Sequence, residues 1–238
     1  MNGTLEESTT LFDSINSNSD KFSDNVEVMV SPSFLYLESF INKGSKSVVV
    51  AAQNCANNLS GAFTGEISVG MLKSIGVSHV IVGHSERRLI YGESIEDISQ
   101  KVALVLQSDM TPIFCIGEEL EDRKSGNHFD VIEKQMQSVL DLSEKQFESI
   151  IVAYEPVWAI GTGETASPEQ AQEMHEFIRE QLRNKYGVLA ENTRILYGGS
   201  VKPSNANQIF SKPDVDGGLV GGAALNTDDF LAIIEAAG

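Results

Sequence analysis

The chain is poor in positive charge: 17 Lys and Arg residues stand against 34 Asp and Glu residues, a formal net charge of −17 at pH 7. Nucleic acids and anionic membranes attract basic surfaces, so this deficit argues against both as partners. An anionic substrate would have to be held by strong local hydrogen-bond donors against the overall field.

Several kinds of segment are absent as well. No Pro/Ser-rich linker or low-complexity tract divides the 238 residues, which predicts one domain over residues 1–238. No stretch approaches the roughly 20 apolar residues that span a bilayer, and no basic segment with a long apolar run opens the chain as a signal peptide would. The two cysteines, Cys55 and Cys115, lie in apolar runs, which indicates buried reduced thiols and a cytoplasmic location.

Short apolar runs recur along the chain, and most are continuous in Val, Ile and Ala, as in parallel strands buried on both faces. They cover residues 26–30, 47–53, 79–83, 112–117, 149–154, 194–198 and 217–222. Helix signals separate them: Ser167 and Pro168 are an N-cap and first-turn pair, and Gly187 offers a stop. Alternating strands and helices predict an α/β fold with a parallel sheet.

The count of strands is seven, whereas a closed (β/α)₈ barrel has eight. The first readable element is a helix over residues 4–17, so the deficit lies at the start of the chain. The sequence therefore predicts a TIM-type barrel that lacks its first strand. Such a barrel would close in distorted form, borrow a partner's segment or associate through the gap, and we favour an altered oligomer.

Two chemically active side chains follow predicted strands. His84 comes just after residues 79–83, and Glu155 comes after residues 149–154, directly before a proline. In a parallel barrel the chemistry gathers at these strand ends. Taken alone, however, His84 also fits a packed or surface histidine, and a Glu-Pro pair also fits an ordinary loop start.

An apolar tip with small residues after it follows Glu155, as in a lid that closes over a ligand. The predicted lid comprises Pro156, Val157, Trp158, Ala159, Ile160, Gly161, Thr162 and Gly163. Double glycines end the last two predicted strands, at 198–199 and 221–222. They fit simple tight turns, and together they also fit a phosphate cradle of backbone N–H groups.

Long motifs carry a family resemblance. The stretches "NCANNLSGAFTGEIS", "VGHSERR", "CIGE", "AYEPVWAIGTG", "YGGSV" and "DGGLVGGAAL" resemble the triosephosphate isomerase family, in its order and roughly its spacing. The likeness extends from Met1 to the C-terminus. It implies interconversion of dihydroxyacetone phosphate and glyceraldehyde 3-phosphate, a reaction of glycolysis and gluconeogenesis.

The resemblance also implies residue roles. Glu155 would be the base that removes a carbon-bound proton, His84 the neutral electrophile and Ser85 a support of the histidine loop. Glu86 would be a carboxylate beside the site paired with Lys101, although a purely structural pair is an equal alternative. The substrate-binding residues implied are Gly161, Ser200, Leu219, Gly221 and Gly222.

One family motif is matched only at its end. Members begin with a strand that ends in a motif like "GNWKMNGT", of which this sequence has Met1 to Thr4. The positions of the motif's asparagine and lysine fall before residue 1, so the catalytic lysine is expected to be missing and turnover strongly impaired. The alternatives are an inactive barrel that keeps phosphate or partner binding, and another phosphate-binding barrel isomerase.

The implied partners are a small triose phosphate and a second copy of the chain. Family members are usually dimers, and the resemblance places Thr64 and Glu66 at the interface of a homo-oligomer. No His, Cys or carboxylate cluster has the spacing of metal ligands, so neither a metal nor an organic cofactor is expected.

Overall fold

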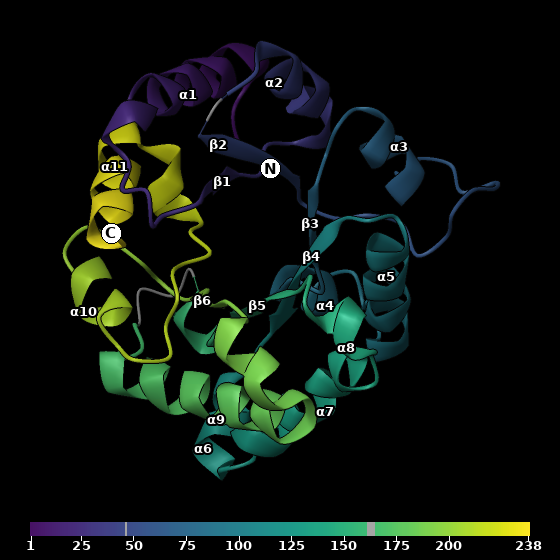
Figure 1. Ribbon diagram of the computed structural model, residues 1–238, viewed down its shortest axis with the longest axis vertical. Helices are drawn as coiled ribbons and strands as arrows, with labels where there is room; N and C mark the ends of the chain where they lie inside the picture. Colours follow the sequence, from purple (N-terminus) through teal and green to yellow (C-terminus); the bar gives the residue numbers. More distant parts are fainter. Residues whose placement is uncertain (46, 161–164) are drawn as a thin grey trace.

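The computed structural model describes residues 1–45, 47–160 and 165–238. Within these ranges the strands form one parallel sheet whose spatial order follows the sequence, each strand pairing with the next. The strands are β1 (Val28–Val30), β2 (Val48–Ala52), β3 (His79–Val82), β4 (Thr111–Ile116), β5 (Ile151–Tyr154) and β6 (Ile195–Tyr197). Figure 1 shows the sheet curled on itself with the helices around its outside. The α/β architecture of the TIM type is therefore confirmed.

Helices connect successive strands, as parallel pairing requires. The α-helices are α1 (Leu5–Ser17), α2 (Leu37–Lys43), α3 (Val69–Ser74), α4 (Ser85–Leu89), α5 (Ile95–Gln107), α6 (Leu120–Ser125), α7 (His128–Leu140), α8 (Glu144–Phe147), α9 (Pro168–Tyr186), α10 (Ala206–Phe210) and α11 (Thr227–Ala236). Shorter 3₁₀ turns are η1 (Ser19–Lys21), η2 (Phe34–Tyr36), η3 (Val157–Ala159), η4 (Gly187–Asn192) and η5 (Gly222–Leu225).

Local capping chemistry sets the ends of the long helices. Thr4 caps α1 through a reciprocal pair of bonds with Glu7, and Ser167 caps α9 in the same way with Gln170. Such a pair satisfies two backbone N–H groups that a helix start otherwise leaves free. The helix expected over residues 4–17 and the start and stop of the helix after Ser167 are both confirmed.

The strands have two buried faces. Side chains such as Val82, Phe114 and Val152 point outward into the main core beneath the helices. Their neighbours in sequence point inward and form a second, smaller cluster of Ile81, Ile113, Cys115, Ile151 and Ala153. Burial on both faces explains why these strands are continuously apolar. Both cysteines are buried and free of disulfides, as expected.

The seventh predicted strand, residues 217–222, was wrong in extent. A single bridge pairs Gly218 with Tyr197, and two backbone bonds of 2.9 Å flank it, from the Tyr197 N–H to Gly217 and from the Leu219 N–H to Tyr197. Gly217 has φ +148°, which a residue with a side chain rarely adopts, and the chain turns into η5 at Gly222. Because of this geometry the segment pairs with β6 at one residue only and does not form a full strand.

A buried arginine holds this end of the sheet. The Nη2 atom of Arg179, from α9, lies 2.6 Å from Asp216 Oδ2, and the same oxygen accepts the Ile195 N–H at 2.7 Å. The loop that leads to residues 217–222 is therefore tied to both β6 and α9. After η5 the chain enters α11, which packs against α1 (Figure 1). The helical layer thus makes contact where β1 and β6 do not pair.

Candidate active site

Glu155 lies at the carboxyl edge of the sheet, one residue beyond β5. Its side chain is 2% exposed, and its backbone N–H donates to Ile116 at 2.7 Å. Glycines of the two neighbouring strands leave the space for it. A Cβ atom on Gly117 would lie 1.9 Å from the Glu155 carbonyl oxygen, and one on Gly198 would lie 2.9 Å from Glu155 Cγ. The chain can accept no side chain at either position without moving Glu155.

The carboxylate of Glu155 meets the residues that follow β3. His84 Nε2 is 3.0 Å from Glu155 Oε1, the Ser85 N–H donates to Glu155 Oε2 at 2.9 Å, and Ser85 Oγ lies 3.3 Å from Oε1. The structure therefore brings together three of the predicted site residues. Hydrogen bonds of this kind offset the free-energy cost of removing a charged carboxylate from water.

The hydrogen bonds of His84 define one tautomer. Its Nδ1 atom accepts the backbone N–H of Glu86 at 3.3 Å, at the start of α4. A nitrogen that accepts a hydrogen bond carries no proton, so the proton of the neutral ring is on Nε2 and points to Glu155.

The pKa of His84 reflects opposing effects. Burial by itself lowers this pKa, but the hydrogen bond with Glu155 and the charges of Glu155 and Glu86 raise it by more, so that the pKa lies above its ordinary value. The Glu86 N–H on Nδ1 opposes a second proton there.

A second buried carboxylate, that of Glu118, holds the residues after Glu155. Its Oε1 atom accepts hydrogen bonds of 2.9 Å from Tyr154 OH and from Trp158 Nε1, while its carbonyl accepts the Val157 N–H at 3.1 Å. Burial raises the pKa of the Glu118 carboxyl, although the bonds from Trp158 and Tyr154 oppose this. No role for Glu118 was predicted from the sequence, in which its signal is its place at the end of the "CIGE" motif.

The expected pair of Glu86 with Lys101 was wrong. Lys101 is buried, and its Nζ atom lies 2.5 Å from Glu93 Oε1 and 2.9 Å from Asn54 Oδ1. The side chain of Glu86 is instead 67% exposed, and its Oε2 atom lies 3.9 Å from His84 Nδ1. Glu93 lies between α4 and α5, 8 residues before Lys101, and its side chain is 9% exposed, whereas Glu86 lies on α4.

The predicted phosphate-binding residues lie on the loops after β6 and residues 217–219. Ser200 and Leu219 are half-buried, and Gly221 and Gly222 are exposed at the start of η5. Among the described residues, no acceptor takes the N–H groups of Gly221 and Gly222. Backbone donors at such a turn suit an anion. Gly161 and the lid residues Thr162 and Gly163 lie outside the described residues.

The described residues of the predicted lid continue from Glu155 into η3. Pro156 and Ala159 are buried, whereas Val157, Trp158 and Ile160 are partly exposed. The predicted interface residues, Thr64 and Glu66, are both exposed. They lie on the segment between β2 and α3, which projects from the body of the molecule in Figure 1.

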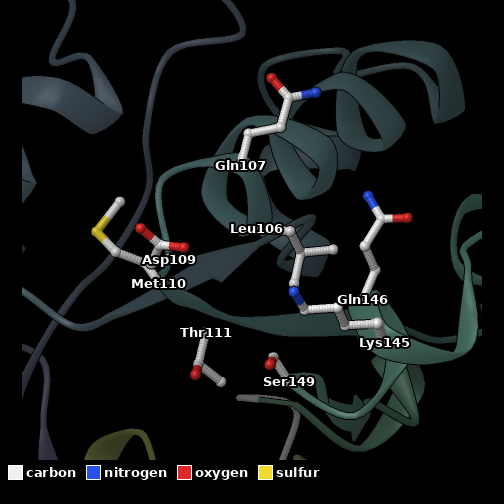
Figure 2. Close-up of a pocket in the computed structure, with 8 residues that line it drawn as sticks. All are labelled: Leu106, Gln107, Asp109, Met110, Thr111, Lys145, Gln146 and Ser149. Atoms are coloured by element: carbon white, nitrogen blue, oxygen red, sulfur yellow. The ribbon is translucent and has the colours of Figure 1, made fainter.

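Two cavities lie at opposite ends of the sheet. A cavity of about 120 Å³ adjoins Glu155 and is also lined by Ser85, Arg88 and Gln135. A larger one, about 420 Å³, is lined at the start of β4 by Thr111 and neighbouring residues of α5 and α8 (Figure 2). Glu155 follows the carboxyl end of its strand, so the larger cavity is remote from the site.

In the part of the chain that the structure describes, no three His, Cys, Asp or Glu side chains gather as a metal site. No described helix has the length and apolar character to cross a membrane.

A carboxylate and an imidazole in contact at the carboxyl edge of a curled parallel sheet define a protein of the TIM-barrel class. A family model described as triosephosphate isomerase matches residues 1–237. The chain therefore belongs to the triosephosphate isomerase family.

Curated relatives are similar over nearly the whole chain. A triosephosphate isomerase of Flavobacterium johnsoniae is 58% identical over 215 residues, which cover 89% of this chain and 86% of that protein. Those of Flavobacterium psychrophilum and Bacteroides fragilis are 54% and 51% identical, each covering 99% of this chain and 95% of the relative.

The contact with Glu155 predicts a pH effect. Replacement of Glu155 by Gln removes the negative charge that favours the imidazolium, so the pKa of His84 should fall. Titration of the His84 ring signals by NMR measures it. Glu86→Gln is the matched comparison and should lower the pKa less, because Glu86 is mostly exposed. An unchanged His84 pKa in Glu155→Gln would contradict the assigned contact.

Proposed function

We propose that this chain interconverts dihydroxyacetone phosphate and glyceraldehyde 3-phosphate by proton transfer through an enediolate. The observation that carries the proposal is the 3.0 Å contact between Glu155 and His84 in a chain that belongs to this family. In this family a glutamate acts as the base and a neutral histidine as the electrophile, and Glu155 and His84 stand at the matching positions.

In this reaction Glu155 removes a proton from the carbon next to the carbonyl. The neutral ring of His84 donates its Nε2 proton toward the carbonyl oxygen, where negative charge develops. Before substrate binds, the two side chains contact each other and Ser85, so Glu155 must exchange these hydrogen bonds for a contact with substrate. Glu86 acts through its backbone N–H, which holds the His84 tautomer.

The phosphate group is bound by backbone N–H groups after the last strands, with Gly221 and Gly222 as the described donors. Ser200 and Gly161 complete this set in the proposal, and Leu219 forms part of the apolar wall. The lid, residues 156–163, closes over the bound substrate and excludes water, with Glu118 as the anchor of its first turn.

The family motif "GNWKMNGT" contains a lysine, and its position falls before residue 1 of this sequence. In the polypeptide of residues 1–238, the described residues include no Lys or Arg that contacts Glu155 or His84. Loss of one preorganised donor at an oxyanion costs about 10²–10³ in rate. We infer that this polypeptide by itself turns over slowly. The alternative of an inactive, purely binding barrel has no support from the relatives.

The base is tested by Glu155→Gln, which keeps the size of the side chain and removes its basicity. General-base catalysis contributes about 10²–10⁴ in rate, so kcat should fall by a factor in that range. A coupled assay in both directions measures it. Glu133→Gln, on the exposed side of α7, is the control and should keep full activity. Equal activity of the two variants would refute the role of Glu155.

The lysine is tested by extension. A strand that bears Asn-x-Lys, joined before Met1, should raise kcat/KM of the 1–238 polypeptide by about 10²–10³. The same extension with Lys replaced by Met is the control, because it restores a strand without the charge. If the 1–238 polypeptide already works at the rate of its relatives, the proposed impairment is wrong.

We also propose that the chain forms a homo-oligomer through the projecting segment that carries Thr64 and Glu66. Light scattering after size exclusion should give more than one chain per particle at micromolar concentration, and Thr64→Arg should shift the mass downward because the larger side chain obstructs the interface. A clean monomer for the parent chain would count against this assembly.

A further inference from the structure

We propose that Gln135 is a positioning residue for Glu155, acting from α7 through the backbone of Gly117. The hydrogen bonds between Gln135 and Gly117 are observed in the structure. Their consequence for catalysis rests on the proposed function. Gln135 belongs to none of the motifs that resemble the family, and it lies 20 residues before Glu155 in the sequence.

The contact is a two-fold hydrogen bond between a side-chain amide and a peptide. Gln135 Oε1 accepts the Gly117 N–H at 2.9 Å, and Gln135 Nε2 donates to the Gly117 carbonyl at 2.8 Å. The amide of Gln135 thus takes the place that a backbone peptide of a neighbouring strand takes inside the sheet. Both bonds require the amide, because one of its ends must accept and the other must donate.

Gly117 needs such a partner because β4 ends one residue earlier, at Ile116. Beyond this point the ladder stops, and buried N–H and C=O groups without partners are costly. Glycine also has the largest conformational freedom of any residue. The sequence has little choice here, since a Cβ atom at this position would lie 1.9 Å from the Glu155 carbonyl oxygen. The residue that must be glycine is therefore held by a side chain from outside.

The position of Glu155 depends on that of Gly117, because their backbones are in direct contact. The Glu155 N–H bonds to Ile116, the residue before Gly117, and the carbonyl of Glu155 lies against the Gly117 Cα. A shift of Gly117 would therefore move the backbone of Glu155 and its 3.0 Å contact with His84. Glu118, the next residue, would move as well, and with it the hydrogen bond from Trp158.

Helix α7 is a firm base for this contact. Ile132, Met136 and Val139 on its inner face are fully buried in the main core. Gln135 lies between the first two and reaches the cavity beside Glu155. A packed core resists displacement, so the Gln135 amide is held in place by the helix that carries it.

The test compares Gln135→Met, which keeps the shape without either hydrogen bond, with Gln137→Ala on the exposed side of α7 and Ile132→Val in its packed face. Misplacement of a catalytic group by about 1 Å costs up to about 10²-fold, so kcat of Gln135→Met should fall between about tenfold and 10²-fold. KM should stay within about twofold. Both controls should keep kcat, although Ile132→Val lowers the melting temperature.

Gln135→Glu adds a pH readout. The ionised carboxylate has no donor for the Gly117 carbonyl, whereas the protonated carboxyl both donates and accepts, as the amide does. The ratio of kcat for Gln135→Glu to kcat for Gln135→Met should therefore rise as the pH falls. Any pH dependence that the two variants have in common cancels in this ratio.

Two spectroscopic signals are independent of turnover. Trp158 is the one tryptophan of the sequence, so its emission reports on Glu118, and the His84 ring signal reports on Glu155. Gln135→Met should shift both, and the controls should shift neither. If the parent chain proves inactive, the proposed function fails while these signals still decide the positioning contact. Unmoved signals in Gln135→Met, or a loss of kcat in Ile132→Val of the same size, would overturn the proposal.

Discussion

The carboxylate of Glu155 is withdrawn from water, and three contacts from residues 84–85 hold it there. Burial of an ionised group is unfavourable unless hydrogen bonds replace its hydration. The other features of the site follow from this requirement. Glycines flank Glu155 on both neighbouring strands, and α4 begins where its first N–H groups reach the carboxylate and the imidazole.

The strand order makes this arrangement possible. In a parallel sheet with sequential order, the ends of β3, β4, β5 and β6 lie at one edge, although the residues that follow them are up to about a hundred positions apart. Each strand end contributes a different part: His84 and Ser85, then Gly117 and Glu118, then Glu155, then Gly198. The two buried carboxylates share this edge but have separate partners. Glu155 faces the imidazole, whereas Glu118 accepts bonds from Tyr154 and Trp158, at the start of the predicted lid.

The net charge of −17 makes local hydrogen-bond donors important for the binding of an anion. An anionic substrate approaches against the field of the whole chain, so its binding depends on short-range donors. The donors that we propose for this role, among the described residues, are the backbone N–H groups of Gly221 and Gly222 and the Nε2 proton of His84. Three cationic side chains of this region are otherwise engaged: Arg88 donates to the carbonyls of Gly83 and Cys115, and Arg87 and Lys101 both pair with Glu93.

The sequence by itself determined the local features of this protein: the capped helices after Thr4 and Ser167, the apolar strands and the positions of His84 and Glu155 at strand ends. These features depend on residues that are close in sequence, so the spacing of apolar residues and the helix-capping residues are enough to predict them. Only the tertiary structure decided which distant groups meet. In the fold, Lys101 pairs with Glu93 and not with Glu86. The Gln135 amide bonds to Gly117, and buried Glu118 accepts a hydrogen bond from Trp158. Residues 217–222 form a single bridge with the sheet. For each of these polar groups the sequence contains several residues that could be its hydrogen-bond or ion-pair partner. Which of them lies close enough depends on how the helices pack on the sheet.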